Sequence, residues 1–325
     1  MTVFIIRRTL QAVIVLLVMS AIVFLGVFAI GDPVAILISP DATQADIDAA
    51  IRNLGLDKPI WEQYLVFLGN ALQGNLGDSF VYNEPAIRLI LQRMPATLEL
   101  AVVAVLLSIF VGIPLGMWAG LRPGGVAGKS IMVGSIFGFS LPNFWQGIML
   151  ILLFAVILGW LPAFGRGDVA EFLGIRSSLW TWDGWAHIIL PAINLALFNT
   201  SLIIRLTRAS VREVIGLDYV KFARAKGLSR RRVVGVHVMK NIMIPLVTVI
   251  GLELASLIAF AVVTETVFAW PGMGKLIIDS IFVLDRPVIV AYMMIIVLMF
   301  IAINLIVDIL YSVFDPRVRL SDMKR

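Results

Sequence analysis

The sequence has no cysteine, only two histidines and few charged residues. Without cysteine the chain can form neither a disulfide nor a thiolate site for zinc or an iron–sulfur cluster. His187 and His237 are too few for a histidine metal cluster. Charged residues make up 14% of the chain, whereas a soluble domain has about a quarter. With 60% hydrophobic residues and a mean hydropathy of +0.98, this composition excludes a water-soluble globule and indicates an integral membrane protein.

The sequence also lacks a phosphate-binding loop. Gly128-Lys129-Ser130 resembles the end of such a loop, but Pro123 stands where the motif requires glycine and no strand precedes it. We therefore expect no ATP hydrolysis by this chain. No pairing of nucleophile and base, no carboxylate pair and no metal-ligand spacing is present, so we predict no catalytic site and no bound cofactor. The net charge of +5 does not indicate nucleic acid, because the basic residues lie in short loops beside apolar segments.

Apolar segments long enough to cross a bilayer, about 20 residues each, recur along the chain. They are Thr9–Ile30, Thr97–Leu121, Ser130–Leu158, Ile188–Leu206, Ile242–Val267 and Val288–Tyr311. Ser130–Leu158 is too long for one straight crossing, and Pro142 should kink or break it. The fold class is therefore an all-α membrane protein with six transmembrane helices. A cleaved signal peptide is the alternative for the first segment, but its apolar core should be only about 7–15 residues long.

These segments suggest an organisation for the whole chain. Residues 1–31 form the first transmembrane helix, 32–96 a small external region, 97–315 a five-helix core with a cytoplasmic loop at about 207–241, and 316–325 a cytoplasmic tail. Within the external region we expect helices from Asp41 to Arg52 and from Pro59 to Leu72. Placing both termini in the cytoplasm puts most of the 26 Lys and Arg residues on the cytoplasmic side, as the positive-inside rule requires.

A basic segment, Leu217–Pro245, stands out from the apolar sequence around it. Asp218 can cap a short helix over Tyr219–Lys226, and Gly227 suits the left-handed residue that ends a helix. Ser229 can cap a second basic helix. Tyr219, Phe222 and Ala223 fall on one side of the first helix, with Lys221 and Arg224 beside them.

Three functions fit this basic segment. It can be a solvated face without a partner, or a patch that attracts anionic lipid headgroups. It can also be a docking helix, which the apolar residues between the charges and the tight helix ends favour.

Ala223-Arg224-Ala225-Lys226-Gly227-Leu228-Ser229 resembles the cytoplasmic loop of ABC importer permeases of the dipeptide/oligopeptide type. Other motifs that resemble this family are Gly31-Asp32-Pro33, Leu54-Gly55-Leu56-Asp57, Pro95-Ala96-Thr97-Leu98-Glu99-Leu100, Ser140-Leu141-Pro142, Glu265-Thr266-Val267-Phe268, Trp270-Pro271-Gly272 and Asp315-Pro316-Arg317-Val318-Arg319. Two positions depart from the general importer motif: Lys221 replaces its glutamate and Lys240 its closing proline.

The resemblance implies a function for the basic segment and a set of partners. The segment would hold the coupling helix that docks on an ATPase subunit, with contacts from Asp218, Tyr219, Phe222, Ala223, Arg224, Ala225, Lys226, Gly227 and Leu228. The partners would be a second homologous permease, two ATPase subunits that hold ATP and magnesium, and an external substrate-binding protein. The chain itself would be a non-catalytic half of a pore in the bacterial inner membrane, with peptides as the expected substrate.

Polar residues inside the apolar segments are candidates for the translocation path. They are Glu253, Asn199, Asn143 and Gln146. Glu253 can attract a positive peptide N-terminus, or it can pair with a residue of a second subunit. The asparagines can equally serve helix–helix hydrogen bonding. By resemblance, Trp270, Pro271 and Gly272 belong to an outer gate.

The alternative function is an ion-coupled secondary transporter or channel that works without an ATPase. Such a protein needs buried acids paired with bases and broken segments repeated in two halves. Glu99 and Glu253 are acids within the apolar segments, but no repeat is visible. A membrane-bound enzyme is a third option, against which the lack of a catalytic constellation argues.

Overall fold

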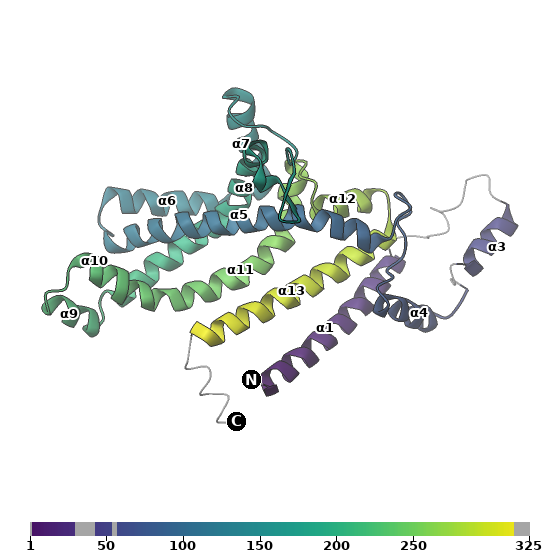
Figure 1. Ribbon diagram of the computed structural model, residues 1–325, viewed down its shortest axis with the longest axis horizontal. Coiled ribbons are helices and arrows are strands. Elements are labelled where there is room, and N and C mark those ends of the chain that lie inside the picture. Colours follow the sequence, from purple (N-terminus) through teal and green to yellow (C-terminus); the bar gives the residue numbers. More distant parts are fainter. Residues whose placement is uncertain (1, 30–42, 54–56, 315–325) are drawn as a thin grey trace. The chain divides into compact units, whose positions relative to one another are not determined.

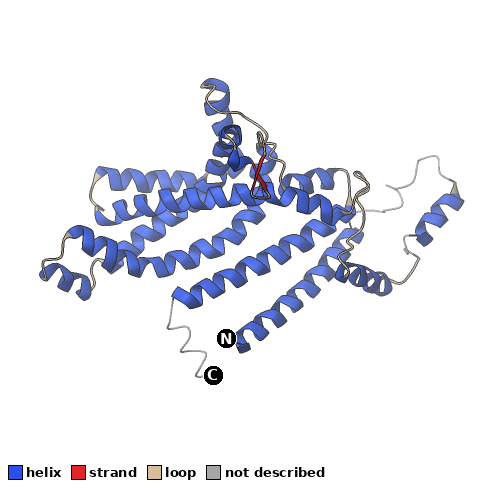
Figure 2. Cartoon of the chain, viewed as in Figure 1, coloured by secondary structure: helices blue, strands red, loops and turns tan. Residues whose placement is uncertain are grey.

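The computed structural model describes residues 2–29, 43–53 and 57–314. Within these ranges the chain is mostly helical, and its strands form one short hairpin (Figure 2). This hairpin pairs β1 (Ala170–Phe172) with β2 (Ile175–Ser177) in antiparallel register. Several sequence predictions fall outside the described residues: the motif at Gly31, most of the motif that begins at Leu54, the cap at Asp41, and the terminal motif and tail.

The described chain forms two compact units. One consists of Met1–Pro95 with Gly272–Ala302, and the other of Ala96–Pro271 with Ile303–Arg325. The helices α5 (Ala86–Leu121) and α13 (Arg286–Phe314) each contribute residues to both units.

The first unit contains the N-terminal helix and the short helices of the predicted external region. Its elements, besides parts of α5 and α13, are α1 (Thr2–Ala29), α3 (Gln44–Asn53), α4 (Ile60–Leu72) and α12 (Met273–Phe282). α4 packs on α1 through a hydrogen bond of 2.8 Å between Ser20 Oγ and Tyr64 Oη and through Phe24, whose ring lies 5.4 Å from that of Tyr64. α3 and α4 confirm the two short helices predicted in this stretch.

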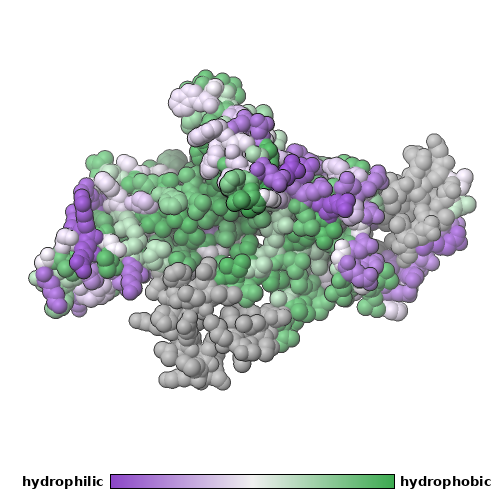
Figure 3. All heavy atoms as spheres, viewed as in Figure 1, coloured by the Kyte–Doolittle hydropathy of each residue, from purple (hydrophilic) through white to green (hydrophobic). Residues whose placement is uncertain are grey.

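The second unit is a helical bundle centred on α8 (Trp182–Val214), which packs against α6 (Val126–Ser140), α7 (Asn143–Leu150) and α11 (Met239–Val267). Helices α5, α6 and α11 run along α8 (Figure 1). A π-helical segment, η1 (Ile151–Ile157), continues α7, and a 3-10 turn, η2 (Ser178–Trp180), precedes α8. On the face shown in Figure 3, apolar residues gather over α5 and α6, whereas hydrophilic residues gather at the end of this unit near α10.

Small residues allow α5 to lie close to α8. Gly112, Gly116 and Gly120 repeat every four residues and so occupy one face of α5. A methyl group added at Gly116 would lie 2.6 Å from Thr207 Cβ and 2.7 Å from the Ile204 carbonyl oxygen. Gly112 and Gly120 leave equally little room, so the stripe sets the separation of the two helices.

The predicted break at Pro142 is confirmed. α6 ends at Ser140, α7 begins at Asn143, and the two axes are bent by 109°. Gln146 Nε2 donates to the carbonyl oxygens of Leu141 at 2.8 Å and Gly138 at 3.2 Å. Since the last carbonyls of a helix have no partner within it, this side chain stabilises the break.

The described helices fit a membrane protein. Three are long and apolar enough to cross a bilayer: α5, α8 and the described apolar part of α13. Up to five crossings result if each bent pair counts as one, the second pair being bent by 50° at the start of α11. The apolar part of α1, Leu10–Gly26, is somewhat shorter. The all-α membrane class is therefore established, while the count of six crossings stays a prediction.

Candidate functional site

The basic segment contains three short elements before α11. They are α9 (Asp218–Ala225), α10 (Arg230–Arg232) and the π-helical η3 (Val233–Val238). α9 is the predicted short helix, but its predicted cap is wrong: Leu217 occupies the N-cap position, and no side chain caps the helix. Asp218 is instead the first helical residue, and its carboxylate lies 2.9 Å from Lys221 Nζ. An acid in the first turn still interacts favourably with the helix dipole.

The C-terminal end of α9 is as tight as the sequence predicts. Gly227 has a φ of +78°, its N–H donates to the Arg224 carbonyl at 2.9 Å, and the Leu228 N–H donates to the Ala223 carbonyl at 3.3 Å. This pair of bonds is a Schellman motif. Ser229 Oγ then accepts from the Arg232 N–H at 3.4 Å, which confirms the second cap.

α9 has one buried and one exposed apolar face. Val220 and Ala223 are buried in a hydrophobic cluster with Val211 and Val214 of α8, Val233 and Val238 of η3, and Ile242 and Leu246 of α11; Leu228 packs against the same cluster. The prediction that Ala223 shares a face with Tyr219 and Phe222 is therefore wrong. Val220 and Ala223 are three positions apart and therefore lie on the same face of the helix, which packs on the bundle. Tyr219 and Phe222, each one position earlier, lie on the neighbouring exposed face.

The exposed face of α9 carries two aromatic rings and several bases. Tyr219 is 40% exposed and Phe222 61%. Lys226 Nζ lies 4.7 Å from the centre of the Phe222 ring, and Arg224 and Ala225 are also exposed. Partial desolvation raises the pKa of the Tyr219 phenol, so this group stays neutral and can donate a hydrogen bond. A surface with these features can bind a partner through apolar contact and charge.

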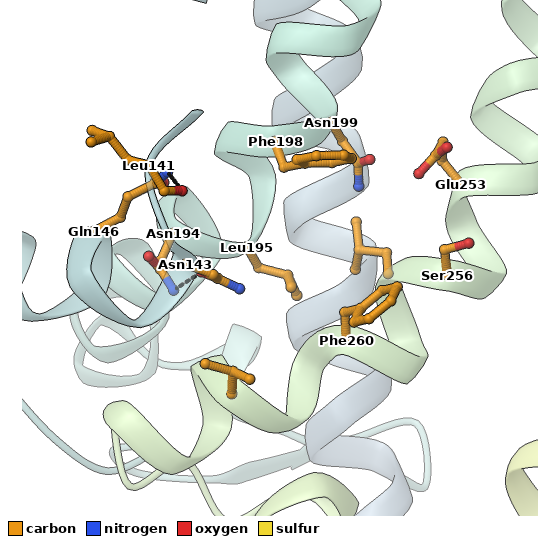
Figure 4. Close-up of a pocket in the computed structure, with 12 residues that line it drawn as sticks. Leu141, Asn143, Gln146, Asn194, Leu195, Phe198, Asn199, Glu253, Ser256 and Phe260 are labelled. Carbon is orange, nitrogen blue, oxygen red and sulfur yellow. Dashed lines mark hydrogen bonds between the residues drawn. The ribbon is translucent and has the colours of Figure 1, made fainter. Parts of the chain in front are cut away.

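A cavity of about 450 Å³ lies in the second unit between α7, α8 and α11 (Figure 4). It is lined by Leu141, Asn143, Gln146, Asn194, Leu195, Phe198, Asn199, Glu253, Ser256, Leu257, Phe260 and Val263. All four residues proposed from sequence for a translocation path, Glu253, Asn199, Asn143 and Gln146, therefore face one cavity.

Four of the polar residues of the cavity fall into two groups. In the first, Asn194 Nδ2 donates to Asn143 Oδ1 at 2.6 Å and to Thr264 Oγ1 at 2.9 Å, which joins α8 to α7 and α11. In the second, Asn199 and Glu253 face each other from α8 and α11 (Figure 4). Apolar side chains separate the two groups, so the cavity offers polar ends and an apolar middle.

The proposed gate residues follow α11. Trp270 is fully buried, its Nε1 donates to the Ala96 carbonyl at 2.9 Å, and its backbone N–H donates to the Glu265 carbonyl at 2.8 Å. Pro271 ends the Ala96–Pro271 segment of this unit, and Gly272 occupies the N-cap position of α12. Trp270 is thus an anchored side chain.

The structural settings of two carboxylates, the partly buried Glu99 and the fully buried Glu265, were not recognised from sequence. Glu99 forms a bidentate pair with Arg166, at 2.6 Å to Nη2 and 3.1 Å to Nε. Glu265 is fully buried and accepts from Thr97 Oγ1 at 2.5 Å. Glu265 lies inside a predicted apolar segment, which is a signal that sequence reasoning could have used. Within the described ranges, no group of three or more His, Cys, Asp or Glu side chains could hold a metal ion.

The sequence matches two family profiles. Residues 112–320 match "Binding-protein-dependent transport system inner membrane component", and residues 1–101 match the N-terminal region of such membrane components. The chain belongs to this family. Members of this permease family are the membrane subunits of ABC importers and work with an ATPase and a substrate-binding protein, so the alternative of an independent secondary transporter is not supported.

Curated relatives of this permease are similar along most of their length. It is 42% identical over 302 residues to the di/tripeptide transport system permease protein DppB of Pseudomonas aeruginosa (strain UCBPP-PA14), covering 89% of this chain and 90% of the relative. It is 39% identical over 320 residues to the oligopeptide transport system permease protein AppB of Bacillus subtilis (strain 168), covering 98% and 99%. It is 36% identical over 317 residues to the glutathione transport system permease protein GsiC of Escherichia coli O6:H1, covering 97% and 98%.

A solved structure supports the permease fold. The inward-facing MetNI methionine ABC transporter matches with a TM-score of 0.53 and 16% sequence identity, covering 70% of this chain and 96% of that chain.

Proposed function

We propose that this permease carries di- or oligopeptides as half of a translocation pore in the bacterial inner membrane, with both termini in the cytoplasm. Its relatives named for di/tripeptides, oligopeptides and glutathione support a substrate with peptide bonds. A second homologous permease completes the pore. Two ATPase subunits bind ATP and magnesium, and an external binding protein delivers the substrate. The chain binds no cofactor and catalyses no reaction itself.

One observation carries the proposed mechanism: the buried face of α9 shares its cluster with the ends of α8 and α11. Val220 and Ala223 fix α9 to both helices, while Tyr219 and Phe222 remain exposed for an ATPase subunit. Because packed interiors move as units rather than deform continuously, a displacement of α9 shifts α8 and α11. These helices line the cavity, so closure of the ATPase pair changes access to it.

The cavity is the proposed translocation path, with Glu253, Asn199, Asn143 and Gln146 along it. Trp270, Pro271 and Gly272 form the proposed outer gate. Support for the path comes from the position of the cavity between helices that α9 connects and from its mixture of polar and apolar walls.

The substitution Gly227→Pro tests the coupling role. Proline fixes φ near −65°, which is incompatible with the φ of +78° at Gly227 and disrupts the Schellman motif. We expect the assembled importer to keep ATPase activity while transport per ATP hydrolysed falls about tenfold or more, a loss of about 1.4 kcal/mol of coupling. The measurement is the ratio of uptake to ATP hydrolysis in proteoliposomes that contain all subunits.

Gly174→Pro is the matched control. Gly174 has nearly the same backbone angle, φ +77°, but lies in the β1–β2 turn. It should leave the ratio unchanged. Normal coupling in the Gly227→Pro variant, with the complex intact, would contradict the coupling role of α9.

A further inference from the structure

Two oxygen acceptors at one end of the cavity have no partner in the described part of the chain. Asn199 is 6% exposed, and its Oδ1 accepts no hydrogen bond. Glu253 is the only charged residue among those that line the cavity, and no hydrogen bond or ion pair joins it to another described residue. Figure 4 shows the amide oxygen of Asn199 turned toward the Glu253 side. Both groups therefore present oxygen to the same space.

The chemistry of this end favours one kind of ligand. A carboxylate only accepts hydrogen bonds, and a buried amide oxygen without a donor has lost its hydration without compensation. A group with several N–H donors and a positive charge satisfies both, whereas an anion is repelled by the carboxylate. The neighbouring Phe198 and Phe260 rings can attract a cation through their faces.

We infer that Glu253 and Asn199 form a subsite for a primary ammonium group carried by the transported substrate. This inference rests on the proposed path, since it assumes that substrate enters the cavity. The apolar middle, lined by Leu195 and Leu257, would then accommodate the rest of a small molecule. The subsite favours cationic over anionic substrates at the permease itself, in addition to any selection by the binding protein.

The absence of cysteine from this chain allows a direct test. Ser256→Cys places one thiol on the cavity lining next to Glu253 on α11. The variant is assembled with cysteine-free partner subunits and treated with methanethiosulfonates that carry an aminoethyl, a sulfonatoethyl or a methyl group. Each labelling rate is divided by the rate for a small thiol in solution. The readout is the ratio of the ammonium to the sulfonate reagent.

We expect this ratio to exceed the solution value by on the order of tenfold or more, because one nearby carboxylate attracts one reagent and repels the other. Glu253→Gln should return the ratio to the solution value. Glu171→Gln, which neutralises an exposed carboxylate in β1, should leave it high. An unchanged ratio in Glu253→Gln would overturn the subsite. So would a low ratio in the parent, the result expected if a basic residue of another subunit pairs with Glu253.

Two further measurements test whether the subsite binds a metal ion instead and whether the cavity is the transport path. If exchanging sodium for a bulky organic cation at constant ionic strength changes the ratio as much as Glu253→Gln, the subsite belongs to a metal ion and the ammonium proposal fails. Transport is measured after labelling in the same samples. Labelling that blocks transport supports the path. If transport continues after labelling with every reagent, the proposed path is refuted. If labelling blocks transport but the ratio of ammonium to sulfonate labelling equals the solution value, only the ammonium subsite is refuted.

Discussion

At the scale of single residues, the second unit holds the Glu99 carboxylate in a closed polar network. Arg166 binds both of its oxygens, and Ser178 Oγ donates to Oε2 at 2.9 Å. The side chains of Arg166 and Glu99 are 15% and 10% exposed. Removing one partner of such a pair leaves a poorly solvated charge, whereas removing both leaves none. Glu99 therefore serves the structure of the loop before α8.

Arg166→Leu should destabilise the protein by about 3–5 kcal/mol, because it leaves the Glu99 carboxylate without its cation. The double variant Glu99→Leu/Arg166→Leu should be less destabilised than the single variant. Unfolding by SDS in mixed micelles measures both differences. A double variant as unstable as Arg166→Leu would mean that lost packing, rather than the stranded charge, determines the effect.

The sequence identified which residues are unusual better than it identified the residues that they contact. Glu99 stood out as an acid within an apolar segment, but Arg166 lies 67 positions away, a separation that no local pattern connects. The error at Asp218 has a local cause: Leu217 adopts the extended N-cap conformation, and the carboxylate pairs with Lys221 instead. The end of α9 at Gly227 and the start of α10 at Ser229 were predictable, because a left-handed glycine and a capping hydroxyl are local signals.

At the scale of helices, the glycine stripe of α5 is a close contact in the bundle that a single substitution can test. Gly116→Ala brings a methyl group within 2.7 Å of a backbone oxygen of α8, so the two helices must separate. We expect a loss of about 1–3 kcal/mol of stability and a lower midpoint of thermal unfolding in detergent.

Gly134→Ala is the control for this prediction. An added methyl group at Gly134 of α6 meets nothing within 4 Å. Alanine favours a helix over glycine, so this variant should be neutral or slightly stabilised. Equal effects of the two substitutions would argue against close α5–α8 packing.

Apolar segments identified the long helices but not their ends. α8 runs over Trp182–Val214, well beyond the predicted Ile188–Leu206. Hydropathy detects only the apolar part of a helix, whereas caps determine its ends. At the start of α8, Thr181 Oγ1 accepts from the Gly184 N–H at 2.9 Å. The glycine repeat was present in the sequence but went unrecognised, because it becomes meaningful only when a neighbouring helix is known.

At the scale of the whole molecule, we expect this permease to obtain its energy from an ATPase subunit. Its sequence has no phosphate-binding loop, and its family works with an ATPase. The purified chain alone in vesicles should therefore accumulate no peptide against a gradient, with or without ATP. Addition of the ATPase subunits, the second permease and the binding protein should restore accumulation. Uphill uptake of radiolabelled peptide by the single chain would contradict the proposed function.

Membrane class and family were predictable at this scale because composition and motifs extend over the whole chain. The cavity was only partly predictable. Its polar residues were selected as unusual within apolar segments, but their convergence depends on how α7, α8 and α11 pack. That packing in turn depends on the break at Pro142 and on the hydrogen bonds of Asn194.

The division of α9 into an inward and an outward face also bears on how importers of this type diversify. Val220 must fit the hydrophobic cluster inside the permease, whereas Tyr219 and Phe222 are exposed and are not constrained by that packing. With the docking role proposed for α9, a change of ATPase would require new side chains on the outward face alone. Grafting the outward-facing side chains of α9 onto a related permease should be enough for that permease to work with the ATPase of this one.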